Sequence, residues 1–168
     1  ILSDTFMKAG YSVVDKATGT VAAGNYVDAF MDASTISNTS PYYLATKSRL
    51  EVGVNGSGST SGTYTYNGAD FSGYYNFFNI GASDSAGGGA VANGLTYASA
   101  VDPATLRPWT TPYKSIVGGA SYIASSYIAK GQNTRYTMKF DLAEFKHQYM
   151  TNVNAPSSEA LTTYNTYN

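Results

Sequence analysis

Residues 53–73 form a long segment of Gly, Ser, Thr, Asn and Tyr that shows no helical periodicity. A loop of this length inside a compact domain is uncommon, and it is usually functional or disordered. The segments on either side do show helical patterns, so the sequence predicts a mainly α domain with long irregular loops. The chain has 168 residues, and we expect one domain over 1–168 because domains usually contain about 100–200 residues.

Capping residues delimit the first two predicted helices. Asn25 is expected to cap a helix that runs to about Ser34. Ser40 followed by Pro41 is typical of a second helix start, and Gly53 is expected to end that helix. Before these helices, Tyr11–Val14 and Thr20–Ala23 predict a small hairpin around a turn at 16–19.

The second half of the chain shows further helical patterns. Helices are predicted at 90–99, from Pro112 to about Gly131, and at 157–164, whereas the alternation at 136–140 predicts a short strand. Gly118 and Gly119 lie inside the strongest of these helices. A glycine pair there costs stability, which indicates that another backbone approaches closely.

The composition excludes several classes of site. The chain contains no cysteine and one histidine, His147, so thiol chemistry, disulfides and sites with two His ligands are excluded. Charged residues make up 12% and the net charge is −1, which predicts neither a nucleic-acid footprint nor a polybasic membrane patch. No apolar run approaches the ~20 residues of a membrane span. The 16 tyrosines instead suit surfaces that bind neutral, hydroxyl-rich ligands.

Elimination among the few acidic residues leads to one candidate general acid. Glutamate occurs at positions 51, 144 and 159. We expect Glu159 in the first turn of a helix, where a carboxylate is favourable, and Glu144 in a solvated segment. Glu51 falls in the last turn of a helix, where the dipole disfavours the charged form of a carboxyl group, as a general acid requires. The alternative is an exposed Glu51 that pairs with Lys47 or Arg49.

A serine hydrolase is the competing chemistry. It would need His147 as the base beside a serine and an orienting carboxylate. The sequence contains no Gly-x-Ser-x-Gly elbow, so His147 is interpreted as a structural or substrate-binding residue. A hydrolase that uses one carboxylic acid, with aromatic and amide side chains to hold the substrate, fits these residues better, and glycosidases are of this kind.

Five segments, in this order, resemble blocks of the family 73 glycoside hydrolases, the glucosaminidase modules of Gram-positive autolysins, with the clostridial members most similar. They are Ser40–Ala45 running into Arg49–Gly53, Gly73–Ala82, Arg107–Trp109 with Ile116–Ala120, Tyr127–Ile128 with Gly131–Thr134, and His147–Asn152. The second resembles the family's Tyr-Asn-x-Phe-x-Ile-Gly-Ala signature. The resemblance covers about Ser40 to Pro156, and the five segments taken together are specific to this family.

The resemblance implies a mainly α, lysozyme-like α+β fold, in which a glycan groove lies between a helical lobe and a loop-rich or small β lobe. The family cleaves the β-1,4 bond that follows N-acetylglucosamine in peptidoglycan. Glu51 matches its catalytic acid. Tyr149 matches a family tyrosine associated with catalysis, whose phenol would orient a water or the acetamido group; the alternative is a tyrosine packed beneath the groove.

The resemblance also implies substrate-binding residues. Asn76 and Phe78 match positions that line the groove, although Phe78 is equally compatible with the core. We expect Asn76, Phe77, Phe78 and Gln148 to position N-acetyl sugars. An amide such as Asn76 offers both a donor and an acceptor to an acetamido group.

The sequence does not identify the second carboxylate. Some family members supply an acid from the flexible lobe, and the candidates here are Asp70 and Asp84. If neither serves, the substrate's own N-acetyl group could act as the nucleophile.

The predicted function is that of an exported autolysin module, secreted to the bacterial cell wall. The chain is expected to be excised from a longer protein, to act as a monomer on peptidoglycan strands, and to need no cofactor or metal. The alternatives are a muramidase or lytic transglycosylase of the same architecture, or a non-catalytic wall-binding module.

Overall fold

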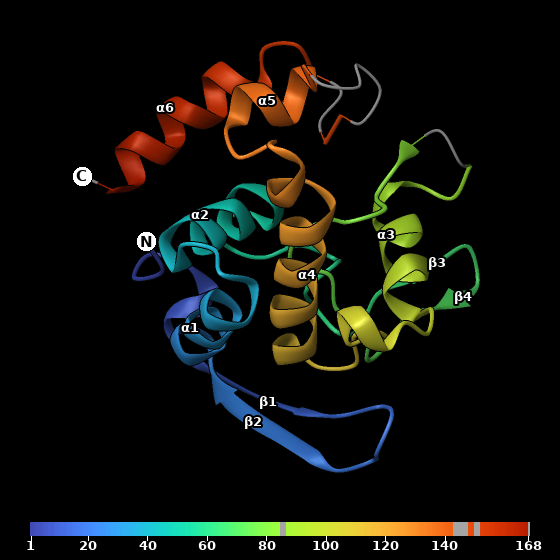
Figure 1. The fold of residues 1–168 in the computed structure, drawn as a ribbon. Coiled ribbons are helices and arrows are strands. Elements are labelled where there is room, and N and C mark those ends of the chain that lie inside the picture. The colour runs from blue at the N-terminus through green and yellow to red at the C-terminus, as the bar shows by residue number, and fades with distance from the viewer. Residues whose placement is uncertain (85–86, 143–147, 150–151, 168) are drawn as a thin grey trace. The chain divides into compact units, whose positions relative to one another are not determined.

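The computed structural model describes residues 1–84, 87–142, 148–149 and 152–167, which cluster into two compact units (Figure 1). The first unit is Ile1–Ser121 and the second is Tyr122–Asn168. Helices and two small antiparallel hairpins make up the first unit, and helices make up the described part of the second. About half of the chain being helical confirms the predicted mainly α, α+β class.

The N-terminal elements follow the predicted capping pattern. After a 3-10 turn at Phe6–Lys8, the hairpin pairs β1 (Gly10–Val14) with β2 (Val21–Asn25), in register from Gly10 opposite Asn25 to Val14 opposite Val21. The Asn25 side chain accepts a hydrogen bond from the backbone N–H of Asp28 at 2.8 Å and begins α1 (Tyr26–Ser37). This helix buries the apolar face formed by Tyr26, Ala29, Phe30 and Ala33.

Helix α2 (Pro41–Val52) has the predicted ends. The Ser40 side chain caps its first turn and Pro41 occupies the first helical position, where its missing N–H costs nothing. Gly53 ends the helix with a φ of 75°, a conformation that favours glycine. The helix buries every side chain from Leu44 to Ser48.

The segment after α2 is irregular, as predicted, apart from a two-residue hairpin of β3 (Thr65–Tyr66) and β4 (Ala69–Asp70). Helix α3 (Ala90–Ser99) matches its predicted range. A 3-10 turn at Pro103–Thr105 then leads into α4 (Pro112–Ser126), within which the boundary between the two units falls. The predicted long helix ends earlier than expected, since Ile128–Lys130 is a 3-10 turn that Gly131 closes.

The second unit corrects two predictions. Residues Arg135–Phe140 form helix α5, so the predicted strand at 136–140 is wrong. The reason is a capping box, in which the Thr134 and Thr137 side chains each accept a hydrogen bond from the other's backbone N–H. Helix α6 spans Ala155–Tyr167, two residues earlier than expected, so Glu159 lies beyond the first turn and pairs with Arg135 at 2.9 Å.

The glycine pair of α4 makes the predicted close approach. A Cβ atom on Gly118 would lie 1.9 Å from the backbone oxygen of Thr105 and 2.5 Å from Nε1 of Trp109. A Cβ atom on Gly119 would lie 2.5 Å from the ring of Phe78. Within the described residues, no helix is long and apolar enough to cross a membrane.

We predict that Gly118→Ala destabilises the fold by about 3 kcal/mol or more, because its methyl group would meet a backbone carbonyl that cannot move aside. Gly94→Ala in α3 is the matched control, since its nearest neighbours would be 3.2 and 3.4 Å away. A methyl group at Gly94 would press on Nδ2 of the buried Asn76 but meet no backbone closer than 3.6 Å, so we expect a smaller loss than for Gly118→Ala. Urea unfolding measures both, and equal midpoints for the two variants would contradict the prediction.

Candidate active site

Glu51 lies in the last turn of α2 and is held at both its side chain and its backbone. Its carboxylate Oε1 lies 2.8 Å from Nζ of Lys47, one turn earlier on the same helix. Its backbone carbonyl accepts a hydrogen bond of 2.7 Å from the side-chain amide of Asn79. The side chain of Glu51 is 22% exposed, so the carboxyl group is fixed and still reaches the surface.

The structure contains the pairing with Lys47 that the sequence offered as the alternative for Glu51. The pairing expected of an ordinary surface glutamate is present, but the Lys47 side chain is 0% exposed and Glu51 is mostly covered. A fully buried lysine is rare unless it is paired, because an isolated ammonium is costly to remove from water. The pair is therefore an internal feature of the helix end and not a solvated surface contact.

Asn76 is completely buried and uses both ends of its amide within the protein. Its Nδ2 donates to the backbone oxygens of Ile80 at 2.8 Å and Gly94 at 2.9 Å, and its Oδ1 accepts from the N–H of Ile80 at 3.1 Å. These bonds close the turn that ends the segment 73–82 and tie it to α3. In this structure Asn76 supports the turn and presents no surface to a ligand.

Phe77 and Phe78 are also core residues, with exposed fractions of 0% and 1%. Phe77 packs against Phe6 and Tyr26, with ring centroids 6.1 and 5.7 Å apart. Phe78 lies against Gly119 of α4. Phe78 is therefore a core residue, which was one of its two interpretations. Neither phenylalanine exposes its ring, and their role in positioning a sugar stays a prediction.

Asn79 is the residue of this segment that sequence reasoning missed. It has a φ of 49°, and its carbonyl accepts from the N–H of Ala82 at 3.0 Å, so its own turn directs its amide toward the end of α2. Asparagine tolerates this left-handed conformation better than most residues. An asparagine before Ile80-Gly81 could have indicated the turn, but nothing in the sequence indicated its partner.

The two candidate second carboxylates occupy different surroundings. Asp70 ends the small β3–β4 hairpin, and its Oδ1 accepts from the backbone N–H of Ser72 at 2.8 Å. The hydrogen bonds from the side chain and backbone of Ser72 hold the pKa of Asp70 below its usual value. Asp84 is exposed in a turn. Among the described residues, neither makes a hydrogen bond or ion pair with Glu51.

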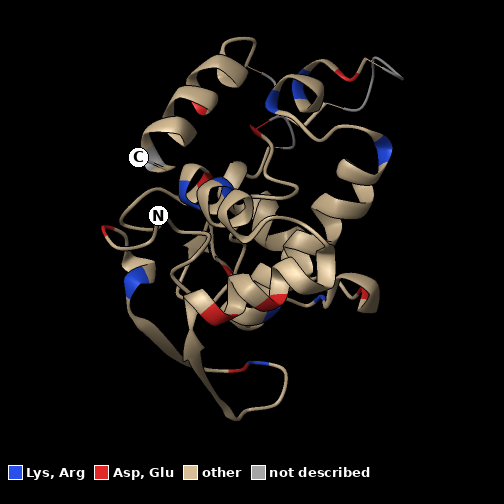
Figure 2. Ribbon diagram, turned by 60° about the vertical axis from the view of Figure 1, so that its left-hand side comes forward, with Lys and Arg blue, Asp and Glu red and all other residues tan. Residues whose placement is uncertain are grey.

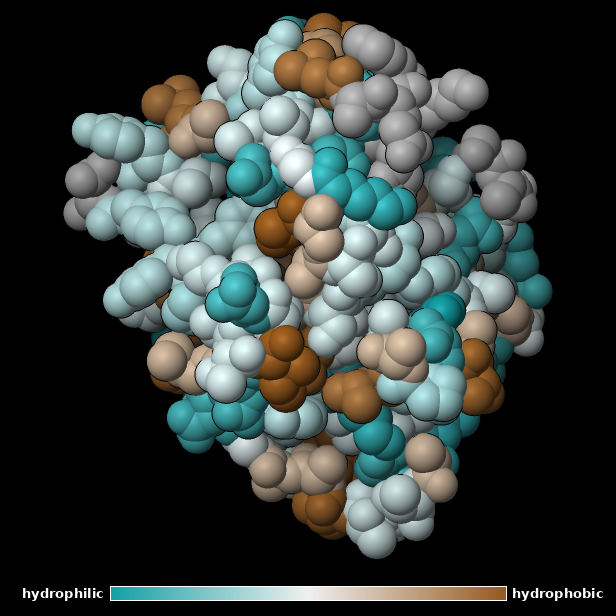
Figure 3. All heavy atoms as spheres, in the orientation of Figure 1, coloured by the Kyte–Doolittle hydropathy of each residue, from teal (hydrophilic) through white to brown (hydrophobic). Residues whose placement is uncertain are grey.

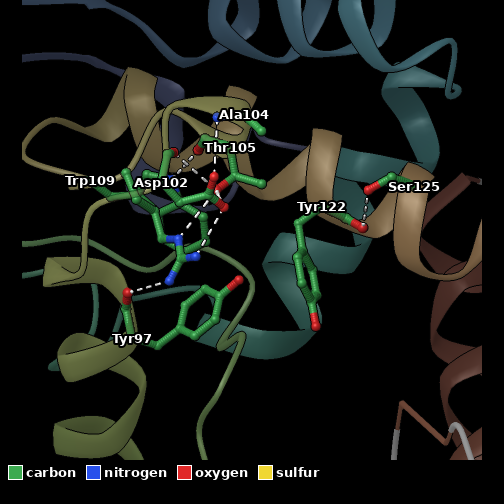
Figure 4. A network of polar contacts seen from close by, with 8 residues as sticks. Tyr97, Asp102, Ala104, Thr105, Trp109, Tyr122 and Ser125 are labelled. Carbon is green, nitrogen blue, oxygen red and sulfur yellow. Dashed lines mark hydrogen bonds and ion pairs between the residues drawn. The ribbon is translucent and has the colours of Figure 1, made fainter.

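The Arg107–Trp109 block is a structural support in the first unit (Figure 4). The guanidinium of Arg107 donates to the Tyr97 carbonyl, to Asp102 and to the hydroxyl of Thr105, at 3.0–3.2 Å, and lies 4.0 Å over the Tyr97 ring. The hydrogen bonds from Thr105 and Arg107 hold the pKa of Asp102 below its usual value. Trp109 is fully buried and donates to the Thr105 carbonyl at 2.7 Å.

Tyr149 and Gln148 belong to the second unit and are described within it. The backbone N–H of Tyr149 donates to the Met138 carbonyl at 3.0 Å, and its half-buried ring meets the Tyr127 ring edge-on, with centroids 5.0 Å apart. Gln148 is exposed, and its Oε1 accepts from Nζ of Lys139 at 2.6 Å. His147 and Glu144 lie outside the described residues.

Charge is sparse over the molecule. Figure 2 shows Lys, Arg, Asp and Glu scattered over many elements, with both signs intermingled. On the face in Figure 3, hydrophobic residues form small separate groups among polar ones.

The described parts of the chain hold no cluster of three or more His, Cys, Asp or Glu that could bind a metal ion.

Two relatives in sequence are a glucosaminidase and an autolysin by name. The chain is 37% identical over 128 residues to a β-N-acetylglucosaminidase of Bacillus subtilis, a match that covers 74% of the chain and 13% of the relative. It is 40% identical over 82 residues to a bifunctional autolysin of Staphylococcus epidermidis, which covers 48% of the chain and 6% of the relative. The chain thus corresponds to a small part of each of these proteins. No family model matches it.

Two solved structures of Staphylococcus aureus autolysin E share the fold. The complex with a muropeptide superposes with a TM-score of 0.62 at 29% identity, over 83% of this chain and 58% of that one. A catalytic mutant, in which a glutamate is replaced by alanine, is bound to the disaccharide NAG-NAM and gives a TM-score of 0.58 at 25% identity, over 83% and 58%.

The fold and these likenesses together place the chain in the lysozyme-like α+β class. Within that class, the chain is a homologue of the bacterial autolysin glucosaminidases, which confirms the resemblance found in the sequence.

We predict that Asn76→Asp destabilises the fold by about 3 kcal/mol, because it removes two buried donors and adds a buried charge. Asn67→Asp is the matched control, since Asn67 is exposed in the hairpin turn and Asp-Gly suits such a turn as well as Asn-Gly does. Urea unfolding at neutral pH measures the difference. A wild-type midpoint for Asn76→Asp would show that its buried bonds do not support the turn.

Proposed function

We propose that this chain hydrolyses the β-1,4 bond that follows N-acetylglucosamine in peptidoglycan, with Glu51 as the general acid. The observation that carries the proposal is the two-point fixation of a partly exposed glutamate at the end of α2. It is supported by a structural relative whose catalytic mutant replaces a glutamate. A fixed carboxyl group that reaches the surface is what proton transfer to a leaving-group oxygen requires.

In the proposed reaction, the Glu51 carboxyl gives its proton to the glycosidic oxygen as the bond from that oxygen to C1 breaks. A water supplies the hydroxyl group at C1, and its other proton restores the Glu51 carboxyl, so the new reducing end is N-acetylglucosamine. Tyr149 is proposed to hydrogen-bond this water or the acetamido group, and Gln148 to bind the sugar. Asn76, Phe77 and Phe78 are proposed to act indirectly: they form the turn and the core that hold the segment 73–82 in place.

Asp70 is the better candidate for the second carboxylate. It lies on a hydrogen-bonded hairpin, and the backbone N–H of Ser72 holds its Oδ1 at 2.8 Å, a fixed placement that suits a base or nucleophile. If neither Asp70 nor Asp84 acts, the acetamido oxygen of the substrate takes the place of the protein carboxylate, a known alternative to the two-carboxylate mechanism.

The proposed partner is the glycan strand of the cell wall, which the chain would meet outside the cell as a monomer. Support for this site of action comes from the autolysin homologues and from relatives bound to NAG-NAM and to a muropeptide.

We predict that wild-type protein releases muropeptides with reduced N-acetylglucosamine ends from purified peptidoglycan, read by mass spectrometry after borohydride reduction. Glu51→Gln should lower the rate by about 10³-fold or more, because the amide cannot supply the proton. Circular dichroism and the urea midpoint check that the variant folds. Reduced or anhydro N-acetylmuramic acid ends would instead indicate a muramidase or transglycosylase, and unchanged activity of Glu51→Gln would remove Glu51 from its role.

For the second carboxylate, we predict that Asp70→Asn lowers kcat by about 10²-fold or more, whereas Asp84→Asn lowers it much less. The measurement is the initial rate of muropeptide release by the two folded variants. A loss confined to Asp84→Asn would reverse the assignment. Full activity of both would point to the substrate's acetamido group.

A further inference from the structure

We infer that Lys47 is a positioning residue for Glu51, and that its buried ammonium group fixes the carboxyl in the place from which it acts. This inference rests on the proposed function of Glu51. The two residues are one helical turn apart on α2, and Nζ of Lys47 lies 2.8 Å from Oε1 of Glu51.

Burial distinguishes this pair from an ordinary pair on a helix surface. Exposed pairs at this spacing contribute little, because both side chains remain mobile and solvated. Here the Lys47 side chain is 0% exposed and that of Glu51 is 22% exposed. The neighbours of Lys47 in the helix, from Leu44 to Ser48, are buried as well. The ammonium therefore has a fixed location, and it fixes the oxygen that it binds.

The backbone of Glu51 is fixed independently. The last carbonyls of a helix have no partner within the helix, and that of Glu51 is bound by the Asn79 amide at 2.7 Å. Asn79 sets where the helix end lies, and Lys47 sets where the side chain points. One carboxylate oxygen is bound to Lys47, and among the described residues the other, Oε2, makes no hydrogen bond, so it is the oxygen left for the substrate.

The charge of Lys47 acts on the carboxylate that the proposed step forms at Glu51. When Glu51 gives its proton to the glycosidic oxygen it becomes a carboxylate, and a fixed ammonium group at 2.8 Å stabilises the charge that develops there. A neutral side chain of the same size would fill the space without this effect. The role of Lys47 is thus expected in the rate of the chemical step rather than in substrate binding.

The experiment compares Lys47→Met, which keeps the length of the side chain, with Lys114→Met. Lys114 forms an ion pair with Asp15, also at 2.8 Å, and has no part in the proposed site, so it is the matched control. We expect Lys47→Met to lower kcat by about 10²-fold with KM unchanged, and Lys47→Arg, which keeps the charge, to retain more activity than Lys47→Met. Lys114→Met should keep the wild-type kcat. If the methionine variant does not fold, Lys47→Gln serves the same comparison.

A second measurement does not depend on activity. Urea midpoints of Lys47→Met, Glu51→Gln and the double variant form a thermodynamic cycle, and we expect a clear departure from additivity if the pair is formed. Additive midpoints would overturn the inference, as would a wild-type kcat for Lys47→Met or an equal loss for Lys114→Met. A third outcome is that the midpoints are non-additive but the protein does not cleave peptidoglycan. That result would refute the proposed function. It would leave Lys47 with a structural role alone, which also overturns the inference.

Discussion

The packing of α4 against the segment 105–109 is the contact on which the first unit depends. At Gly118 the helix backbone approaches the Thr105 carbonyl and the Trp109 ring so closely that no side chain fits between them. At Gly119 the same helix receives the ring of Phe78. Two glycines in a helix cost about 1 kcal/mol each relative to alanine. Their cost is offset by the burial of two large aromatic rings.

A line of short contacts leads from this packing to the helix that carries Glu51. Ser115 of α4 accepts a hydrogen bond of 3.0 Å from the backbone N–H of Phe77. The neighbouring Asn76 closes the turn in which Asn79 lies, and Asn79 binds the last turn of α2. Sequence blocks that are far apart in the chain are thereby joined around one carboxyl group. Phe77, Asn76 and Ser115 are buried, so these residues hold the end of α2 in place.

The sequence predicted the helices well because their ends carry local signals. Asn25, Ser40-Pro41 and Gly53 each act within one turn of the chain, so their effect is visible without tertiary structure. The strand predicted at 136–140 is wrong because the segment is short, and a Thr134–Thr137 capping box outweighs its weak alternation.

The candidate site was less predictable, because its contacts join distant segments. Elimination made Glu51 a candidate, since few carboxyl groups compete with it, and the family resemblance favoured it further. The burial of Asn76 was not visible, because an asparagine that binds a sugar and one that closes a turn look alike in a sequence. The partner of Asn79 was not visible either, since its amide meets a carbonyl 28 residues away.

The burial of Lys47 decides which substitution of Glu51 leaves its surroundings intact. Any change at Glu51 also changes the surroundings of a fully buried ammonium group. Alanine there would leave Nζ facing a cavity, and the helix end would be free to rearrange around it. Glutamine keeps an oxygen at the position of Oε1, so Nζ retains an acceptor at that point. An inactive glutamine form should therefore preserve the shape of the resting site more faithfully than a truncated one.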